Sequence, residues 1–82
     1  MSLVLQLREQ LDRLKRQKID LSLRADANVK AAKELLSISA YSALMEIDLK
    51  TAAHHLSLAI RDQEELEAVL ADIRKIEREL GA

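Results

Sequence analysis

The chain has 82 residues, no cysteine, no proline and one glycine, with 49% hydrophobic residues, 33% charged residues and a formal net charge of −1. This length allows one small domain, and the chain lacks the residues that hairpin turns and phosphate-binding loops need. Disulfides and thiolate metal sites are excluded, and the near-zero net charge argues against a nucleic-acid partner. The remaining composition is typical of long helices or coiled coils.

The first part of the chain carries apolar residues at alternating spacings of three and four, which places them on one stripe of a helix. We predict a helix over about 3–36. Two polar residues, Lys18 and Asn28, interrupt the stripe. Each either fixes the register or oligomeric state of the helices, or has a simpler role: Lys18 extends out to solvent and Asn28 ends the strict stripe. The apolar members of the stripe are Val4, Leu7, Leu11, Leu14, Leu21, Ala25, Ala32 and Leu35.

A joint is predicted at about 37–42, where the chain has its only cluster of serines. Serine competes for backbone hydrogen bonds and favours helix caps over helix interiors, so Ser39 or Ser42 is the expected N-cap of a second helix. The apolar pattern can also be threaded through this segment. The alternative is therefore one uninterrupted helix about 120 Å long.

A second helix is predicted over about 43–80, with Gly81 ending it. Its apolar stripe consists of Leu49, Ala52, Leu56, Ala59, Leu66, Leu70, Ile73 and Leu80, with Gln63 and Glu77 as polar interruptions. Asp62 followed by Glu65 resembles a capping box, so a break near 61–63 and a third helix are an alternative.

Large apolar side chains outside the stripes favour a bundle over a simple rod, because each one left exposed forgoes about 1.5–3 kcal/mol. Residues 1–41 hold 8 Lys/Arg and 5 Asp/Glu (+3), and residues 42–82 hold 5 and 9 (−4), so the two halves attract one another when folded back. The predicted fold is all-α: a single helical domain over 1–82, folded as a long antiparallel helical hairpin. We expect a homodimer, in which two hairpins form a coiled-coil-like four-helix bundle.

Enzymatic activity is not expected, because the sequence holds no nucleophile–base pair, no glycine loop and no cofactor fingerprint. His54 and His55 alone resemble a site, but adjacent residues on a helix point about 100° apart and cannot both bind one ion. Asp48, His55 and Asp62 share a face, yet two turns separate neighbours by roughly 10 Å. We therefore expect no metal site, no cofactor, and two histidines on a helix surface.

The predicted function is a non-enzymatic protein–protein interaction module: an adaptor, co-chaperone or assembly factor that presents an apolar helix face to a helical protein partner. The residues predicted to bind the partner are large, apolar and outside the stripes: Leu44, Ile47, Leu58, Ile60, Val69 and Ile76.

The alternative function is an accessory protein that contacts nucleic acid or a membrane surface. Its contacts are expected from a basic cluster, which consists of Arg13, Lys15, Arg16 and Lys18. Asp12 and Asp20 flank this cluster, and it contains no aromatic side chain for base stacking. A solvated helix face is the simpler interpretation of the same residues.

No apolar run is long enough to span a membrane and no signal peptide is present, so a cytoplasmic location is expected. In size and in its helical-hairpin pattern, the chain resembles the small helical chaperones of type III secretion needles, which bind aggregation-prone partners through an exposed apolar helix face. That resemblance implies a chaperone-like role. The run Leu44–Ala52, together with Glu64-Glu65-Leu66, resembles the helical domain of tRNA-modifying GTPases. It implies no activity, since the GTPase domain and the cysteine motif are lacking.

Overall fold

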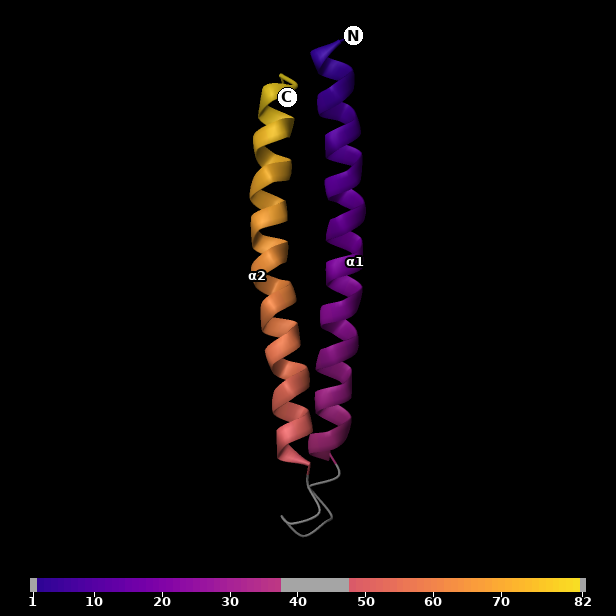
Figure 1. Ribbon diagram of the computed structural model, residues 1–82, viewed down its shortest axis with the longest axis vertical. Helices are drawn as coiled ribbons and strands as arrows, with labels where there is room; N and C mark the ends of the chain where they lie inside the picture. The colour runs from indigo at the N-terminus through magenta and orange to yellow at the C-terminus, as the bar shows by residue number, and fades with distance from the viewer. Residues whose placement is uncertain (1, 38–47, 82) are drawn as a thin grey trace.

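The computed structural model describes residues 2–37 and 48–81, and it contains two long helices. Helix α1 spans Leu3–Ser37 and helix α2 spans Leu49–Glu79. The helices lie side by side in opposite directions, so the N- and C-termini are at the same end (Figure 1). The described chain measures 63 × 17 × 14 Å. The predicted all-helical hairpin is therefore confirmed, and the alternative of one uninterrupted helix is wrong.

Helix α1 forms because its sequence holds strong helix formers and no glycine or proline. At its start, the backbone N–H of Val4 donates to the Ser2 hydroxyl at 3.2 Å and satisfies one of the free amide groups of the first turn. At its end, the Ser37 hydroxyl donates to the carbonyl of Glu34 at 2.9 Å. The sequence placed this helix at about 3–36, one residue short of its end.

Helix α2 starts at a cap that the sequence interpretation missed. The carboxylate of Asp48 accepts the backbone N–H of Thr51 at 2.9 Å and also the Thr51 hydroxyl. These two hydrogen bonds lower the pKa of the Asp48 carboxyl below its ordinary value. The bond from the Thr51 hydroxyl has the larger effect and the bond from the Thr51 amide the smaller one. Asp48 is therefore the N-cap of α2, and the predicted caps Ser39 and Ser42 lie outside the described residues.

The rest of α2 is continuous. It runs through 61–63 without a break, so no third helix starts there, and the capping-box interpretation of Asp62 is wrong. The expected end is confirmed: Gly81 adopts a φ of 85° and its N–H donates to the carbonyl of Arg78 at 3.1 Å. Glycine fits this C′ position because it has no Cβ to clash in the left-handed region.

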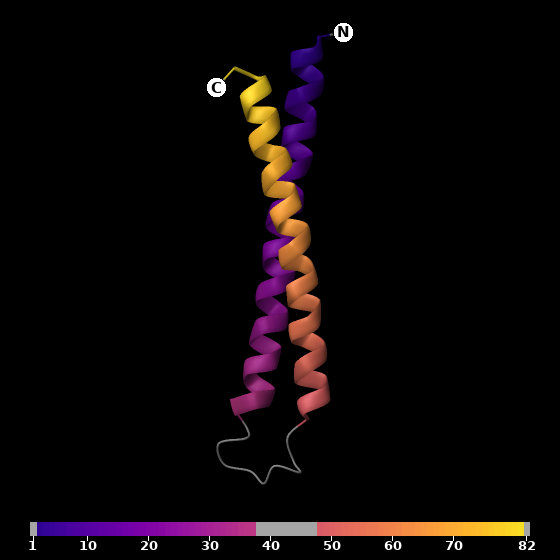
Figure 2. The same ribbon diagram turned by 90° about the vertical axis from the view of Figure 1, so that its left-hand side faces the viewer.

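The two helices bury their inner faces against each other. In α1 the inner face follows the predicted stripe: Leu21 is 2% exposed and Ala32 is 1% exposed. The core cluster joins Leu21 to Val69 and Ile73 of α2. Leu11, Leu14 and Leu66 pack around this cluster. The helices cross one another along their length, as alternating three- and four-residue spacings require (Figure 2).

In α2 the predicted stripe is wrong by one position. The alanines and Ile73 are inside as expected, but Leu49 and Leu56 are 51% and 40% exposed. At four positions the residue that faces α1 is one place earlier than predicted. These residues are His55, Asp62, Val69 and Ile76, in place of Leu56, Gln63, Leu70 and Glu77. The inner face of α2 consists of Ala52, His55, Ala59, Asp62, Leu66, Val69, Ile73, Ile76 and Leu80, all buried or half-buried.

Candidate functional site

The two long sides of the hairpin differ in chemistry. One side, which we call the apolar flank, has a groove of about 500 Å³. The residues lining this groove are Ser22, Ala25, Asp26, Val29, Leu56, Ala59, Ile60, Gln63 and Leu66. The opposite side, the polar flank, has a smaller hollow of about 310 Å³. Its lining residues are Arg24, Asn28, Leu58, Arg61, Asp62 and Glu65.

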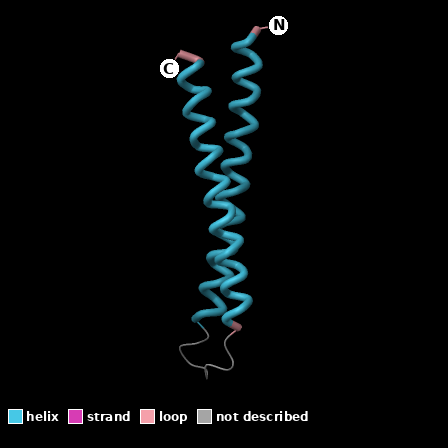
Figure 3. The backbone as a smooth tube through the Cα atoms, turned by 60° about the vertical axis from the view of Figure 1, so that its left-hand side comes forward, coloured by secondary structure: helices cyan, strands magenta, loops and turns pink. Residues whose placement is uncertain are grey.

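Helix periodicity explains why the flanks are built as they are. Ser22 and Val29 each follow an inner-face residue of α1 by one position, and Leu56 does the same on α2, which puts all three on the same side of the contact. The tubes of the two helices stay adjacent over this region (Figure 3). Leu56 at 40% exposed and Ile60 at 56% exposed border the groove without being covered by the described chain.

The polar flank is organised by hydrogen bonds between the helices. Nδ1 of His55 lies 2.8 Å from Oδ1 of Asn28. The amide nitrogen of Asn28 donates to the carbonyl of Arg24 at 3.0 Å. This second bond orients the amide, so the Asn28 oxygen accepts and the Nδ1 of His55 donates. Asn28 therefore sits in the helix contact with both ends of its amide satisfied, whereas Lys18 is exposed.

An ion pair lies one turn further along. Arg24 Nη2 is 3.1 Å from the Asp62 carboxylate and 3.9 Å from that of Glu65. The Asp62 side chain is 13% exposed while that of Arg24 is 62% exposed, so the pair is anchored at the Asp62 end and solvated at the other. This ion pair and the Asn28–His55 bond therefore both help to fix the register between α1 and α2.

The residues predicted to bind a partner do not lie on one surface. Val69 and Ile76 are 6% and 5% exposed because they pack against α1. Leu58 is half-buried beside the charged residues of the polar flank, whereas Ile60 is on the apolar flank. Leu44 and Ile47 lie outside the described residues. The residues that sequence reasoning missed here are Val29 and Leu56.

The basic cluster does not form one face. Its four side chains are exposed, but helix geometry puts Arg13 and Arg16 on one side of α1 and Lys15 and Lys18 on roughly the opposite side. Four cations spread around a helix cannot all contact one phosphate backbone or one membrane surface.

The histidines are not arranged as a metal site. Their ring centroids are 6.1 Å apart; His54 is exposed and His55 is half-buried. Among residues 2–37 and 48–81, no three side chains of the metal-binding types lie close enough to hold one ion. His55 instead serves the contact between the helices.

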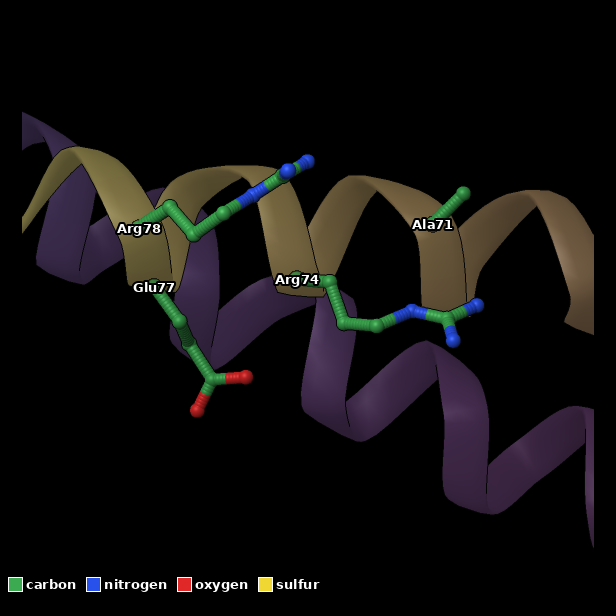
Figure 4. A pocket seen from close by; sticks show the side chains of 4 residues that line it. All are labelled: Ala71, Arg74, Glu77 and Arg78. Carbon is green, nitrogen blue, oxygen red and sulfur yellow. The ribbon is translucent and has the colours of Figure 1, made fainter. Parts of the chain in front are cut away.

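A further hollow of about 570 Å³ lies near the open end of α2. Its lining residues, Ala71, Arg74, Glu77 and Arg78, all come from α2 (Figure 4). The Glu77 carboxylate and the Arg74 guanidinium extend in different directions (Figure 4). The Nε of Arg74 donates to the Leu70 carbonyl at 3.3 Å. Convergent polar groups, which a ligand site needs, are not formed by these residues.

Neither described helix is long and apolar enough to cross a membrane. Comparison with protein-family models, with curated proteins and with solved structures found no match to this chain.

Proposed function

We propose that this protein is a non-enzymatic protein–protein interaction module, an adaptor, co-chaperone or assembly factor, whose apolar flank receives a helical partner. One observation carries the proposal: large apolar side chains border a groove on one side of the hairpin, while charged side chains line the other side. An exposed apolar groove beside polar surroundings is typical of a protein interaction site.

The groove has a shape that suits a helix. Ala25 and Ala59 belong to the inner faces of the two helices and give the groove a low floor, and Val29, Leu56 and Ile60 stand higher beside it. Small residues let another backbone approach, and larger ones pack against its side chains. Recognition of an amphipathic helix in a groove uses this combination.

The finer parts of the proposal follow from the same surface. A homodimer that closes into a four-helix bundle covers the apolar flank of both chains and supplies the helical partner. A cytoplasmic location stays a prediction of the sequence.

Site-specific photo-crosslinking in cells tests the proposal. A photoreactive amino acid at position 60 of the full chain should form adducts with a polypeptide, either another copy or a different protein. The same amino acid at position 61, on the polar flank, is the matched control and should form few. Equal adduct formation at the two positions, or none at position 60, contradicts the proposal.

A further inference from the structure

The hairpin exposes more surface than a compact protein of its mass. A compact monomer of 9.3 kDa exposes about 5,000 Å², whereas this chain exposes 6429 Å². The difference is larger than the roughly 800 Å² that one partner buries in a standard protein interface. The hairpin therefore has more than enough excess surface for one standard interface along its length.

The charges of the helices indicate what covers that surface. Helix α1 holds eight Lys/Arg and five Asp/Glu, a formal +3, and helix α2 holds five and seven, a formal −2. A bundle in which each α1 lies between two α2 helices alternates the sign of the charge around its axis. A bundle that sets α1 against another α1 places like charges together.

The apolar flank also carries complementary charges beyond its groove. Three charged residues of α1, nearer the end of the hairpin that holds the termini, occupy the same heptad positions as Ser22, Asp26 and Val29. They are a cation, an anion and a cation. The corresponding positions on α2 hold an anion, a cation and Leu70, with a further anion about one turn beyond Leu70. From the open end inward, the residues are Arg8, Asp12 and Lys15 on α1 and Glu77, Arg74 and Glu67 on α2.

Two pairs of these charges are level with one another, and none of the six charges is used within the hairpin. Two contacts fix the register of the helices: Asn28 bonds to His55, and Leu7 and Ile76 line one hollow. In this register Arg8 lies at nearly the same height along the hairpin as Glu77, and Asp12 at nearly the same height as Arg74. In the described chain the ion pairs between the helices all involve Arg24, so none of the six charges is paired across the hairpin.

We infer that the apolar flank is covered by a second copy of this chain, with both loops at the same end and α1 of each copy against α2 of the other. This inference rests on the proposed function and names its partner. A two-fold axis parallel to the helices produces the arrangement. It brings Val29 near the partner's Leu56, Arg8 near the partner's Glu77 and Asp12 near the partner's Arg74.

Cross-linking tests the arrangement cleanly because the chain has no cysteine of its own. Two variants, Val29→Cys and Leu56→Cys, are made in separate full-length chains, and one of them carries a size tag. The chains are mixed and treated with a short bismaleimide. We expect a mixed dimer from the mixture and little product from either variant alone. Mixing separate chains prevents a link within one hairpin.

Matched controls come from the polar flank, where Ala31→Cys and Leu58→Cys are mixed in the same way and should give no mixed dimer. If Val29→Cys alone links efficiently to itself, α1 lies against α1 and the arrangement is wrong. If every sample stays uncross-linked and light scattering of the wild-type chain gives the mass of one chain, the second copy is wrong.

Charge reversal provides an independent test. Arg74→Asp places an anion near the partner's Asp12 twice in each dimer, and we expect a dimer dissociation constant weakened by about tenfold at low salt. The double variant Asp12→Arg/Arg74→Asp should restore it. Arg78→Asp, on the outer surface of α2, is the control and should have little effect. Failure of the double variant to restore the dimer overturns the inferred pairing.

The two proposals fail differently. A chain that has the mass of one molecule but forms adducts with another polypeptide at position 60 overturns the second copy and leaves the interaction module standing. A chain that forms neither overturns both.

Discussion

The two flanks of this hairpin come from the same two helices, yet they differ in polarity and in how far the hairpin covers them. The polar flank is closed by bonds that the hairpin makes with itself, between Asn28 and His55 and between Arg24 and Asp62. The apolar flank holds Leu56 and Ile60 at 40% and 56% exposed. The difference teaches that the hairpin satisfies its polar flank by itself and leaves large apolar side chains uncovered on the other flank.

The largest expected effect separates the inner face from the apolar flank. Ile76 and Ile60 are the same residue type on the same helix, at 5% and 56% exposed. Ile76→Ala should lower the free energy of unfolding by about 3 kcal/mol because it leaves a cavity between the helices. Ile60→Ala should cost under about 1 kcal/mol because little of its area is buried. Urea unfolding at a concentration where each variant is monomeric measures both.

The same pair of variants also decides between two interpretations of Ile76. The sequence placed Ile76 among residues that bind a partner, and the structure places it in the hairpin contact. Equal losses of stability for the two alanine variants contradict the flank assignment.

A medium effect is expected at the polar bond between the helices. Asn28→Ala leaves the half-buried His55 without its acceptor and should cost about 1–2 kcal/mol. Replacing both residues with leucine removes the polar groups together, so Asn28→Leu/His55→Leu should be near neutral or stabilising. A double-mutant cycle from urea unfolding gives the coupling energy between the two side chains. A coupling near zero means that the bond does not hold the polar flank together.

The smallest effect is expected at the cap of α2, which belongs to neither flank. The hydrogen bonds from Thr51 lower the pKa of Asp48 in the folded chain, so the stability they provide is present above the unfolded pKa, near pH 4. It is lost as the pH falls through the lower folded pKa. Asp48→Asn keeps a capping side chain but cannot titrate, and should reduce the fall in melting temperature below about pH 4. An unchanged pH profile in that variant contradicts the assigned cap.

Much of the fold was predictable because helix periodicity is local. The stripe of α1 and the end of α2 at Gly81 follow from residue spacing and from the one glycine. The antiparallel pairing was favoured by the serine cluster, the opposite charges of the two halves and the apolar residues outside the stripes, with one uninterrupted helix as the alternative. The start of α2 was missed because Asp48 lies among apolar residues, and the serine cluster was a stronger cap signal. The signals for Asp48 were its own residue type, which is a preferred N-cap, and Thr51 three residues later.

The apolar flank was harder to predict because α2 carries two overlapping stripes. Both contain Ala52, Ala59, Leu66 and Ile73, and they differ by one position elsewhere. Considered by itself, Leu56 is better suited to the inner face than His55, because leucine is apolar and histidine is polar. The choice depends on the other end of the helix, where Val69 and Ile76 bury more apolar surface than Leu70 and Glu77.

The sequence by itself determined that the chain is helical and which face of α1 is apolar, because these follow from local spacing, and the opposite charges of its two halves favoured antiparallel pairing over one uninterrupted helix. Only the tertiary structure decided which side of α2 faces inward. A rigid helix presents one face along its whole length, so the face that buries Val69 and Ile76 also brings His55 and Asp62 to the contact. Asn28 and Arg24 supply polar partners to these two residues, which offsets the cost of partly burying them. That rotation by one position turned Leu56 outward and created the apolar flank.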